Sequence, residues 1–198
     1  HNHYILMRTE SNPSFAERHQ LSVDELEIKT RNWKQLLLKE REKRVCPGLD
    51  DKILASWNAL TTSGLISCYK AFGNPEYLKL ALANANFLKQ KMRSGDGKIL
   101  HSYKNKQAKI TGFLEDYAFA IEAFTAIFEV TGDKEWLNLA QHLTEITFLD
   151  FYDVEKSIFY FTASQQKDLI TRTIEIHDNV IPSSNSVIAK NLFRLSYL

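Results

Sequence analysis

The chain has 198 residues, of which 44% are hydrophobic and 12% aromatic, enough apolar material for one substantial core. Lys and Arg number 25 against 24 Asp and Glu, so a net charge of +1 gives no electrostatic reason to expect a nucleic-acid or membrane partner. Two cysteines without a CxxC pair, no opening signal peptide and no apolar run of about 18 residues predict a soluble, cytoplasmic protein.

Residues 1–44 are expected to form an extended segment followed by a lead-in helix. Residues 3–9 alternate weakly, and a loop is expected around Asn12-Pro13. Ser22 and Glu25 have the spacing of a capping box that begins a helix. The helix ends in alternating charges near Arg44, which we interpret as a solvated face. Its apolar stripe consists of Leu26, Trp33, Leu36 and Leu37.

Residues 45–198 repeat one helical hairpin. Each hairpin has an amphipathic helix, a short turn with Gly and a polar residue, and a second helix that begins with Glu, an aromatic residue and Leu. The repeat distance is about 59 residues, and a third copy begins at Ser184. The helices are expected at residues 51–72, 76–92, 114–131 and 134–149.

Short strand pairs are expected between the helical hairpins. The first pair is residues 98–104 with 108–110, and the second is residues 158–162 with 169–176. This order predicts an all-α fold, an incomplete (α/α)6 toroid of the six-hairpin glycosidase-like type with short β-hairpins between helix pairs. Its inner helices would be parallel, and their amino ends would favour anionic or hydroxyl-rich ligands on one face.

Four ordered motifs begin or join these helices: PGLDDKILASWN at residues 47–58, GFLEDYAF at 112–119, TGD at 131–133 and PSSNSV at 182–187. Together they resemble the spermatogenesis-associated, thioredoxin-like protein family over nearly the whole chain. The resemblance implies an amino-terminal thioredoxin-like domain outside this sequence, followed by a toroid similar to N-acylglucosamine 2-epimerases and glycosidases. This chain would form roughly the first half of that toroid. The resemblance implies no assigned activity.

Three positions depart from the pattern of that family. Ser184 replaces a Gly, Ser157-Ile158 replaces a Gly-Gly pair, and HSYK at residues 101–104 replaces a run similar to Arg-Ser-Tyr-Arg. All three lie at or near expected helix starts and strands, where a polar site would be built.

Acidic residues at two helix starts are candidate catalytic groups, because glycoside hydrolysis needs an acid and a base or nucleophile across the scissile bond. The same pattern is typical of helix caps, each of which stabilises a helix by about 1 kcal/mol. Both interpretations are open. The candidates are Asp50, Asp51, Glu115 and Asp116.

Seven further residues are candidates for contacting a sugar. Aromatic rings stack on sugar rings, amides donate and accept hydrogen bonds, histidine titrates near neutrality, and arginine clamps carboxylates or phosphates. The alternatives are core positions for the aromatic residues, loop hydrogen bonds for Asn185, an ordinary surface or loop position for the histidine and a cross-strand ion pair for the arginine. The candidates are Trp57, Asn58, His101, Tyr117, Arg172, Asp178 and Asn185.

No metal set and no cofactor are expected, because the carboxylates are adjacent or distant and neither cysteine has a spaced partner. Two functions are open: a glycosidase-like or sugar-epimerase-like domain, and a non-catalytic ligand-binding or scaffold module attached to the thioredoxin-like domain. The expected partners are a carbohydrate ligand, that domain and, through open toroid edges, a second copy of the chain.

Overall fold

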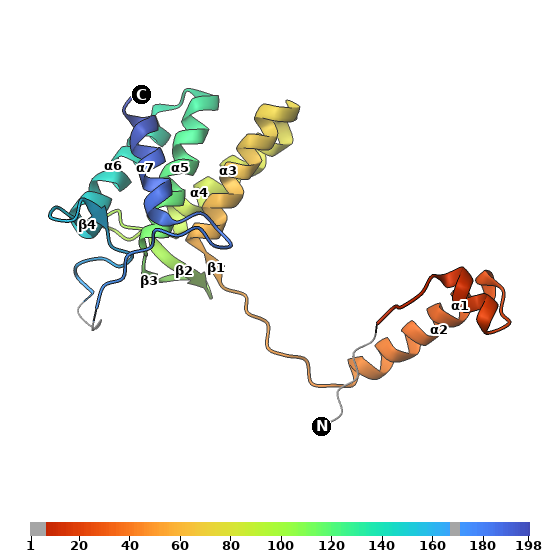
Figure 1. Ribbon diagram of the computed structural model, residues 1–198. Coiled ribbons are helices and arrows are strands. Elements are labelled where there is room, and N and C mark those ends of the chain that lie inside the picture. Colours follow the sequence, from red (N-terminus) through yellow and green to blue (C-terminus); the bar gives the residue numbers. More distant parts are fainter. Residues whose placement is uncertain (1–6, 167–170) are drawn as a thin grey trace. The chain divides into compact units, whose positions relative to one another are not determined.

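The computed structural model describes residues 7–166 and 171–198, which fall into two compact units, residues 1–50 and 51–198 (Figure 1). The first unit contains helices α1 (Asn12–Arg18) and α2 (Val23–Glu42). The predicted capping box is confirmed, since the Ser22 backbone N–H donates to Glu25 Oε2 at 2.8 Å and the Glu25 N–H donates to Ser22 Oγ at 3.2 Å. No helix of the described residues is long and apolar enough to cross a membrane.

One expectation for this unit needs correction. The residues around Asn12-Pro13 begin α1 instead of forming a loop, because Ser11 caps the helix and Pro13 occupies its first turn, where no backbone N–H is needed. The described part of the expected extended segment, residues 7–9, forms no strand, and residues 3–6 lie outside the described residues. Within the predicted stripe of α2, Leu26 is buried whereas Trp33, Leu36 and Leu37 are exposed.

The second unit has the expected architecture, an incomplete toroid of helical hairpins. Helix α3 (Ala55–Phe72) packs on α4 (Pro75–Lys91), and α5 (Leu114–Thr131) packs on α6 (Lys134–Phe151). Helix α5 also packs on α3 and on α7 (Ser184–Leu195), so the inner helices α3, α5 and α7 lie side by side (Figure 1). The prediction of a repeated hairpin is confirmed.

The two hairpins turn in the same way. Gly73 and Gly132 end the inner helices with φ angles of 66° and 70°, a backbone conformation that favours glycine. Asn74 and Asp133 then cap the outer helices, each accepting the backbone N–H two residues later at 3.0 Å. The equal chemistry of these turns explains why the repeat is visible in the sequence.

The core is centred on α5, the inner helix that has neighbours on both sides. Its side chains Phe119, Phe124 and Ile127 are fully buried. Small residues of the outer helices let them approach closely, as Ala81 and Ala140 do with no exposed surface. The first-turn residues of α5 are therefore held by the best-packed part of the molecule.

A three-stranded antiparallel sheet lies at the amino ends of the inner helices, in the order β1 (Ile53–Leu54), β2 (Leu100–Lys104), β3 (Gln107–Thr111). The predicted β2–β3 hairpin is confirmed. Its turn residues Asn105 and Lys106 have φ angles of 51° and 61°, as in a type I′ turn. The helix expected from residue 51 begins at Ala55 because the two residues before it pair with β2.

The second predicted hairpin, residues 158–162 with 169–176, is wrong in the strand that pairs with residues 158–159. Strand β5 (Ile158–Phe159) pairs with β4 (Tyr152–Asp153), which follows α6 directly. Asp153 closes this tight turn by accepting the backbone N–H groups of Glu155 and Lys156. Residues 171–176 form no strand, although the Phe161 N–H donates to the Thr173 carbonyl at 2.8 Å, and residues 169–170 lie outside the described residues.

Candidate functional site

The candidate site is built around Asp116 in the first turn of α5. Its carboxylate is fully buried and accepts three hydrogen bonds of 2.9 Å, from the backbone N–H groups of Ser56 and Phe113 and from the ring of His101. Ser56 lies in the first turn of α3 and Phe113 is the N-cap of α5. One carboxylate therefore satisfies unpaired N–H groups of two inner helices and holds a side chain of β2.

Gly112 makes this arrangement sterically possible. Its N–H donates to the Ile99 carbonyl at 3.0 Å, and a Cβ at this position would lie only 2.7 Å from that oxygen. The close approach sets the position of Phe113, whose ring stacks on Phe161 with centroids 5.1 Å apart and meets the His101 ring at 4.8 Å.

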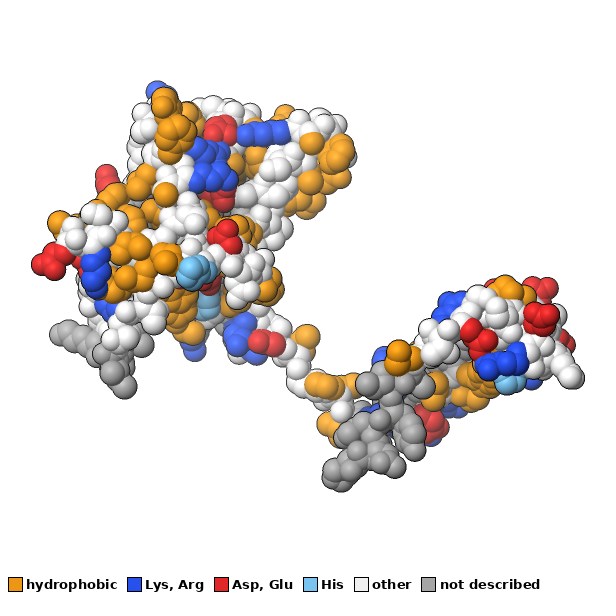
Figure 2. Space-filling model, in the orientation of Figure 1, with side chains coloured by type: hydrophobic (Ala, Val, Ile, Leu, Met, Phe, Trp, Pro, Cys, Tyr) orange, Lys and Arg blue, Asp and Glu red, His pale blue; other side chains and the backbone are white. Residues whose placement is uncertain are grey.

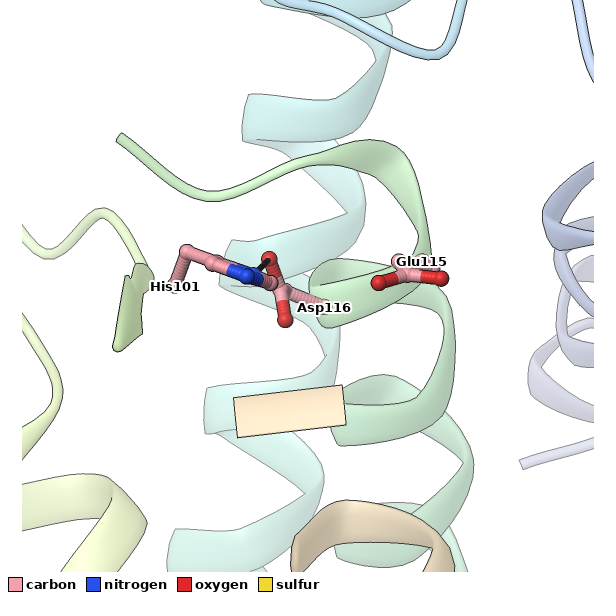
Figure 3. Close-up of side chains that lie close together, drawn as sticks. All are labelled: His101, Glu115 and Asp116. Carbon is pink, nitrogen blue, oxygen red and sulfur yellow. Dashed lines mark hydrogen bonds and ion pairs between the residues drawn. The ribbon is translucent and has the colours of Figure 1, made fainter. Parts of the chain in front are cut away.

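His101 is oriented by its neighbours and largely shielded, with 17% of its side chain exposed. Its Nδ1 is bound to Asp116, and Nε2 has no hydrogen-bond partner among the described residues (Figure 3). The hydrogen bond to Asp116 raises the pKa of His101 above its usual value, against the opposing effect of burial. The imidazole is thus a proton carrier with one nitrogen held and one available.

Glu115 lies beside this pair at the amino end of α5 and is half-buried (Figure 3). Ser56 Oγ donates to its Oε1 at 3.3 Å. Burial raises the pKa of Glu115, and the negative charges of Asp116 and Glu175 raise this pKa further. Figure 2 shows histidine and acidic side chains close together on one face of the toroid unit.

Ser56 and Glu175 are the two residues of this site that the sequence analysis missed. Glu175 accepts the Ser184 N–H at 3.2 Å and the Ser184 hydroxyl at 2.7 Å, which ties the segment before α7 to the amino end of that helix. The departure of Ser184 from the Gly of the resembling family was the available signal, because only a side chain at this position supplies the hydroxyl.

The fold brings together a histidine and two carboxylates that the sequence separates by 14 or 15 positions, with ligand atoms of His101, Glu115 and Asp116 all within 4.8 Å of one another. Their hydrogen bonds determine what this group can do. Both Asp116 oxygens already accept hydrogen bonds, and His101 Nδ1 is in direct contact with one of them. The geometry therefore suits proton transfer better than coordination of a metal ion.

Tyr117 is a core residue and cannot stack on a sugar, which corrects its assignment as a binding residue. Its ring has no exposed surface and packs on Phe151 with centroids 5.1 Å apart, and its hydroxyl accepts the Ile99 N–H at 3.2 Å. Burial raises the pKa of its hydroxyl far above the usual value. Trp57, in the first turn of α3, is 62% exposed and remains available as an aromatic platform.

Asp51, before α3, does not join the cluster of His101, Glu115 and Asp116. Asp51 is exposed and forms an ion pair with Lys104 on β2, and its hydrogen bond to Lys104 lowers the pKa of Asp51. Asp50 is also exposed. Asn58 is half-buried, and its amide donates to the Leu54 carbonyl at 2.8 Å, so it supports the start of α3.

Three further candidates hold the loop that leads into α7, and the structure gives them structural roles. Arg172 donates to the carbonyls of Thr162 and Asp150 and lies over the Tyr160 ring, and within residues 7–166 and 171–198 it forms no ion pair. Asp178 accepts the Ser183 N–H at 2.8 Å. The Asn185 side-chain amide accepts the Phe159 N–H and donates to the Phe159 carbonyl. It thus makes the two hydrogen bonds that a neighbouring strand would make.

The repeated hairpins with polar amino ends of the inner helices define the class: an (α/α) toroid of the kind found in carbohydrate-active enzymes. A cellobiose 2-epimerase from Bacillus thermoamylovorans matches 74% of this chain and 39% of its own at 14% identity, with a TM-score of 0.62. A GH76 α-mannanase from Bacteroides thetaiotaomicron matches 78% of this chain and 38% of its own at 11% identity, with a TM-score of 0.60.

Residues 31–190 match the model of the β-L-arabinofuranosidase GH127 catalytic domain, and the chain belongs to this family. Spermatogenesis-associated protein 20 of Mus musculus is 29% identical over 205 residues, which cover 98% of this chain and 26% of the relative. The uncharacterized protein B0495.5 of Caenorhabditis elegans is 28% identical over 202 residues, covering 98% and 27%. The chain thus spans about a quarter of these relatives, and the resemblance inferred from its motifs is confirmed.

Proposed function

We propose that the toroid unit binds carbohydrate at the amino ends of α3, α5 and α7 and acts on it by acid–base chemistry, as a glycosidase-like or epimerase-like domain. The observation that carries this proposal is the half-buried Glu115 carboxyl, whose pKa is raised, beside a histidine that a buried carboxylate orients. Perturbed acids next to oriented bases are typical of catalytic sites. The fold and the family support the same class of substrate.

The two proton-carrying groups have complementary roles in this proposal. Glu115 has its pKa raised by burial and so keeps its proton closer to neutrality, as a general acid requires. His101, held through Nδ1 by Asp116, presents Nε2 as the base once it has lost its proton. Asp116 is a positioning residue here, because its oxygens are occupied by His101 and two backbone N–H groups.

The charge of the site favours a neutral ligand over an anionic one. When Glu115 is ionised, the carboxylates of Glu115, Asp116 and Glu175 outnumber the positive groups that act on the same site, the His101 imidazole and the Lys52 ammonium, whereas the helix amino ends alone would favour anions. A carboxylate accepts the hydroxyl protons of a neutral sugar and repels a uronate or a sugar phosphate. Trp57 adds an exposed ring at the amino end of α3 on which such a sugar can stack.

One observation favours the second function, a non-catalytic ligand-binding or scaffold module. Asp116 caps α3 and α5 at once, and this role alone explains its burial. On this alternative, His101 and Glu115 complete the polar surroundings of the cap, and the toroid serves as a support for a thioredoxin-like domain.

The deciding experiment compares wild type with Glu115→Gln and with Glu145→Gln, a matched change of an exposed glutamate on α6. Turnover of nitrophenyl glycosides, including a β-L-arabinofuranoside, and heats of binding of neutral sugars are measured on the full-length protein. We expect Glu145→Gln to behave as wild type and Glu115→Gln to bind sugar but lose at least about 100-fold in kcat, the contribution typical of a general acid. A folded wild type that neither binds nor turns over any sugar would establish the scaffold alternative.

A further inference from the structure

We propose that a cavity separate from the His101 site, the Lys98 cavity, binds a neutral hydroxyl-rich molecule of monosaccharide size. The cavity has a volume of about 330 Å³, at the lower end of the range for small-molecule sites. It is formed by the segment between α4 and β2, the outer ends of β2 and β3, the end of α6 and the loop after β5. None of its lining residues is His101, Glu115, Asp116 or Glu175.

The wall of this cavity carries a shielded ion pair. Lys98 Nζ lies 2.6 Å from Asp150 Oδ2, and only 9% of the Asp150 side chain is exposed. Asp150 lies in the last turn of α6, where the helix dipole disfavours a negative charge, so Lys98 compensates it. The ammonium group has three donors, and Asp150 is its sole hydrogen-bond partner within the described ranges. Two N–H donors are therefore left for a molecule in the cavity.

Acceptors and neutral amides surround this ammonium group. The Asp96 carboxylate accepts a hydrogen bond from Ser94, which lowers the pKa of Asp96 and keeps it ionised. The side chains of Thr111, Gln165 and Gln166 complete the polar wall. Each hydroxyl of a sugar donates one hydrogen bond and accepts others, so alternating carboxylate acceptors and ammonium or amide donors match a row of hydroxyls.

The balance of charge selects against anions. Among the lining residues, one ammonium, that of Lys98, faces two carboxylates, Asp96 and Asp150, so a carboxylate or phosphate ligand would add a negative charge to a lining that already has an excess of one. A neutral sugar adds none. The Arg172 guanidinium lies behind this lining and donates to the Asp150 backbone carbonyl. The volume and the charge together point to a neutral monosaccharide or the terminal residue of a longer saccharide.

The backbone of the cavity is held in place without a ligand. The Asp150 carbonyl accepts the Ser164 N–H at 2.7 Å and a guanidinium N–H of Arg172 at 3.2 Å, which joins the end of α6 to the loop after β5. On the other side, the Ser94 N–H donates to the Lys98 carbonyl at 2.9 Å. Such a site needs little ordering when it binds.

Amide chemical-shift titration of the full chain with D-glucose, D-mannose and D-glucuronate tests this proposal. We expect saturable shifts at residues 94–100 and 163–166 with a neutral sugar, and at least tenfold weaker binding of the uronate. The double variant Lys98→Met/Asp150→Leu removes both charges together, which spares the fold an unpaired buried charge, and should abolish these shifts. Glu115→Gln should leave them unchanged, because the two sites share no residue.

Absence of saturable shifts in folded wild type, or their persistence in the folded double variant, would overturn the proposal. If the double variant does not fold, Asp96→Asn decides the question, since Asp96 is exposed and its replacement leaves the Lys98–Asp150 pair intact. We expect this variant to bind the neutral sugar at least threefold more weakly. Unchanged affinity would contradict the assignment of Asp96 to the site.

Discussion

Asp116 is the residue on which the candidate site depends. It receives hydrogen bonds from α3, from the N-cap of α5 and from β2, and it has no exposed surface. A carboxylate in this position has two roles that cannot be separated by inspection, capping and orientation of His101. They can be separated by measurement, because capping acts on stability and orientation acts on the titration of the imidazole.

Replacement of Asp116 by Asn should therefore be costly. An amide keeps one acceptor but places an NH2 group against backbone N–H donors, so we expect a loss of about 2 to 4 kcal/mol in the free energy of unfolding, measured with chemical denaturant. The matched control is Asp133→Asn, at the exposed cap of α6, where the other hairpin already uses Asn74. The control should change stability by less than about 0.5 kcal/mol, because Asn and Asp are equivalent N-caps. Equal losses in both variants would refute the special role of Asp116.

The titration of His101 gives a second prediction. Its hydrogen bond to Asp116 raises its pKa in the folded protein, so His101 contributes stability that is complete below its unfolded pKa of about 6.5 and is lost as pH rises through the folded value. The difference in unfolding free energy between wild type and His101→Gln should fall across that interval. NMR titration of the imidazole gives the folded pKa directly, and a value at or below 6.5 would contradict the role of Asp116.

At the scale of elements, the start of α5 depends on a close approach of two backbone segments. Gly112 lies against the Ile99 carbonyl and the Tyr117 ring, and both are held by the core. Farther along the inner helices, ion pairs link α3, α5 and α7, with Lys70 and Arg194 both bound to Glu129 at 2.8 and 2.7 Å. Asp116 joins the amino ends of α3 and α5, and these charges join the later turns of all three helices, which keeps the helices side by side.

A pair of glycine substitutions tests this view of the helix start. A Cβ at position 112 would lie 2.7 Å from the Ile99 carbonyl oxygen, and a backbone atom cannot move away cheaply, so Gly112→Ala should destabilise the protein. Gly64→Ala, in the middle of α3 with nothing within 4 Å of the new Cβ, should stabilise it by up to about 1 kcal/mol through helix propensity. In thermal denaturation, we expect the melting temperature to fall for Gly112→Ala and to rise for Gly64→Ala. A rise for Gly112→Ala would contradict the close approach of Gly112 to the Ile99 carbonyl.

At the scale of the whole molecule, the toroid gathers the amino ends of its inner helices on one face, and side-chain charge decides what that face can bind. The helix dipoles favour anions, but the carboxyl groups of Glu115, Asp116 and Glu175 lie there and outnumber the positive groups His101 and Lys52. Full charges at short range outweigh the partial charges of helix ends. The site should therefore distinguish sugars by charge before it distinguishes them by stereochemistry.

Calorimetry with a neutral sugar and its uronate measures this preference. Wild type should bind D-glucose more tightly than D-glucuronate at the α5 site, and Glu175→Gln should raise the affinity for the uronate about three- to tenfold while keeping an oxygen that accepts from Ser184. Titrations in the Lys98→Met/Asp150→Leu background exclude the heat of sugar binding to the Lys98 cavity. If wild type binds the uronate more tightly, the carboxylates of the site do not disfavour anionic sugars. The proposal that the site binds sugars would still hold.

The sequence predicted the helices well because their signals are local. Helix α5 was expected at residues 114–131 and begins and ends there, and the capping box at Ser22 and Glu25 forms as expected. The second β-hairpin was misassigned for two reasons. Hydrophobic alternation predicts a strand but does not indicate which strand pairs with it. Strand β4, directly after α6, has only two residues and therefore no alternation to detect. Tyr117 was misassigned because a first-turn position does not reveal which face of the helix is covered.

By itself, the sequence determined the repeated helical hairpin, since periodic apolar residues, left-handed glycines and capping residues act over a few positions in the chain. Only the tertiary structure decided which polar residues meet. Asp116 joins His101 from 15 positions away and Ser56 from 60, while Asp51, which looked equivalent, pairs with Lys104 instead. These meetings depend on how closely helices and strands approach in the packed core, and packing distance is not encoded in local periodicity.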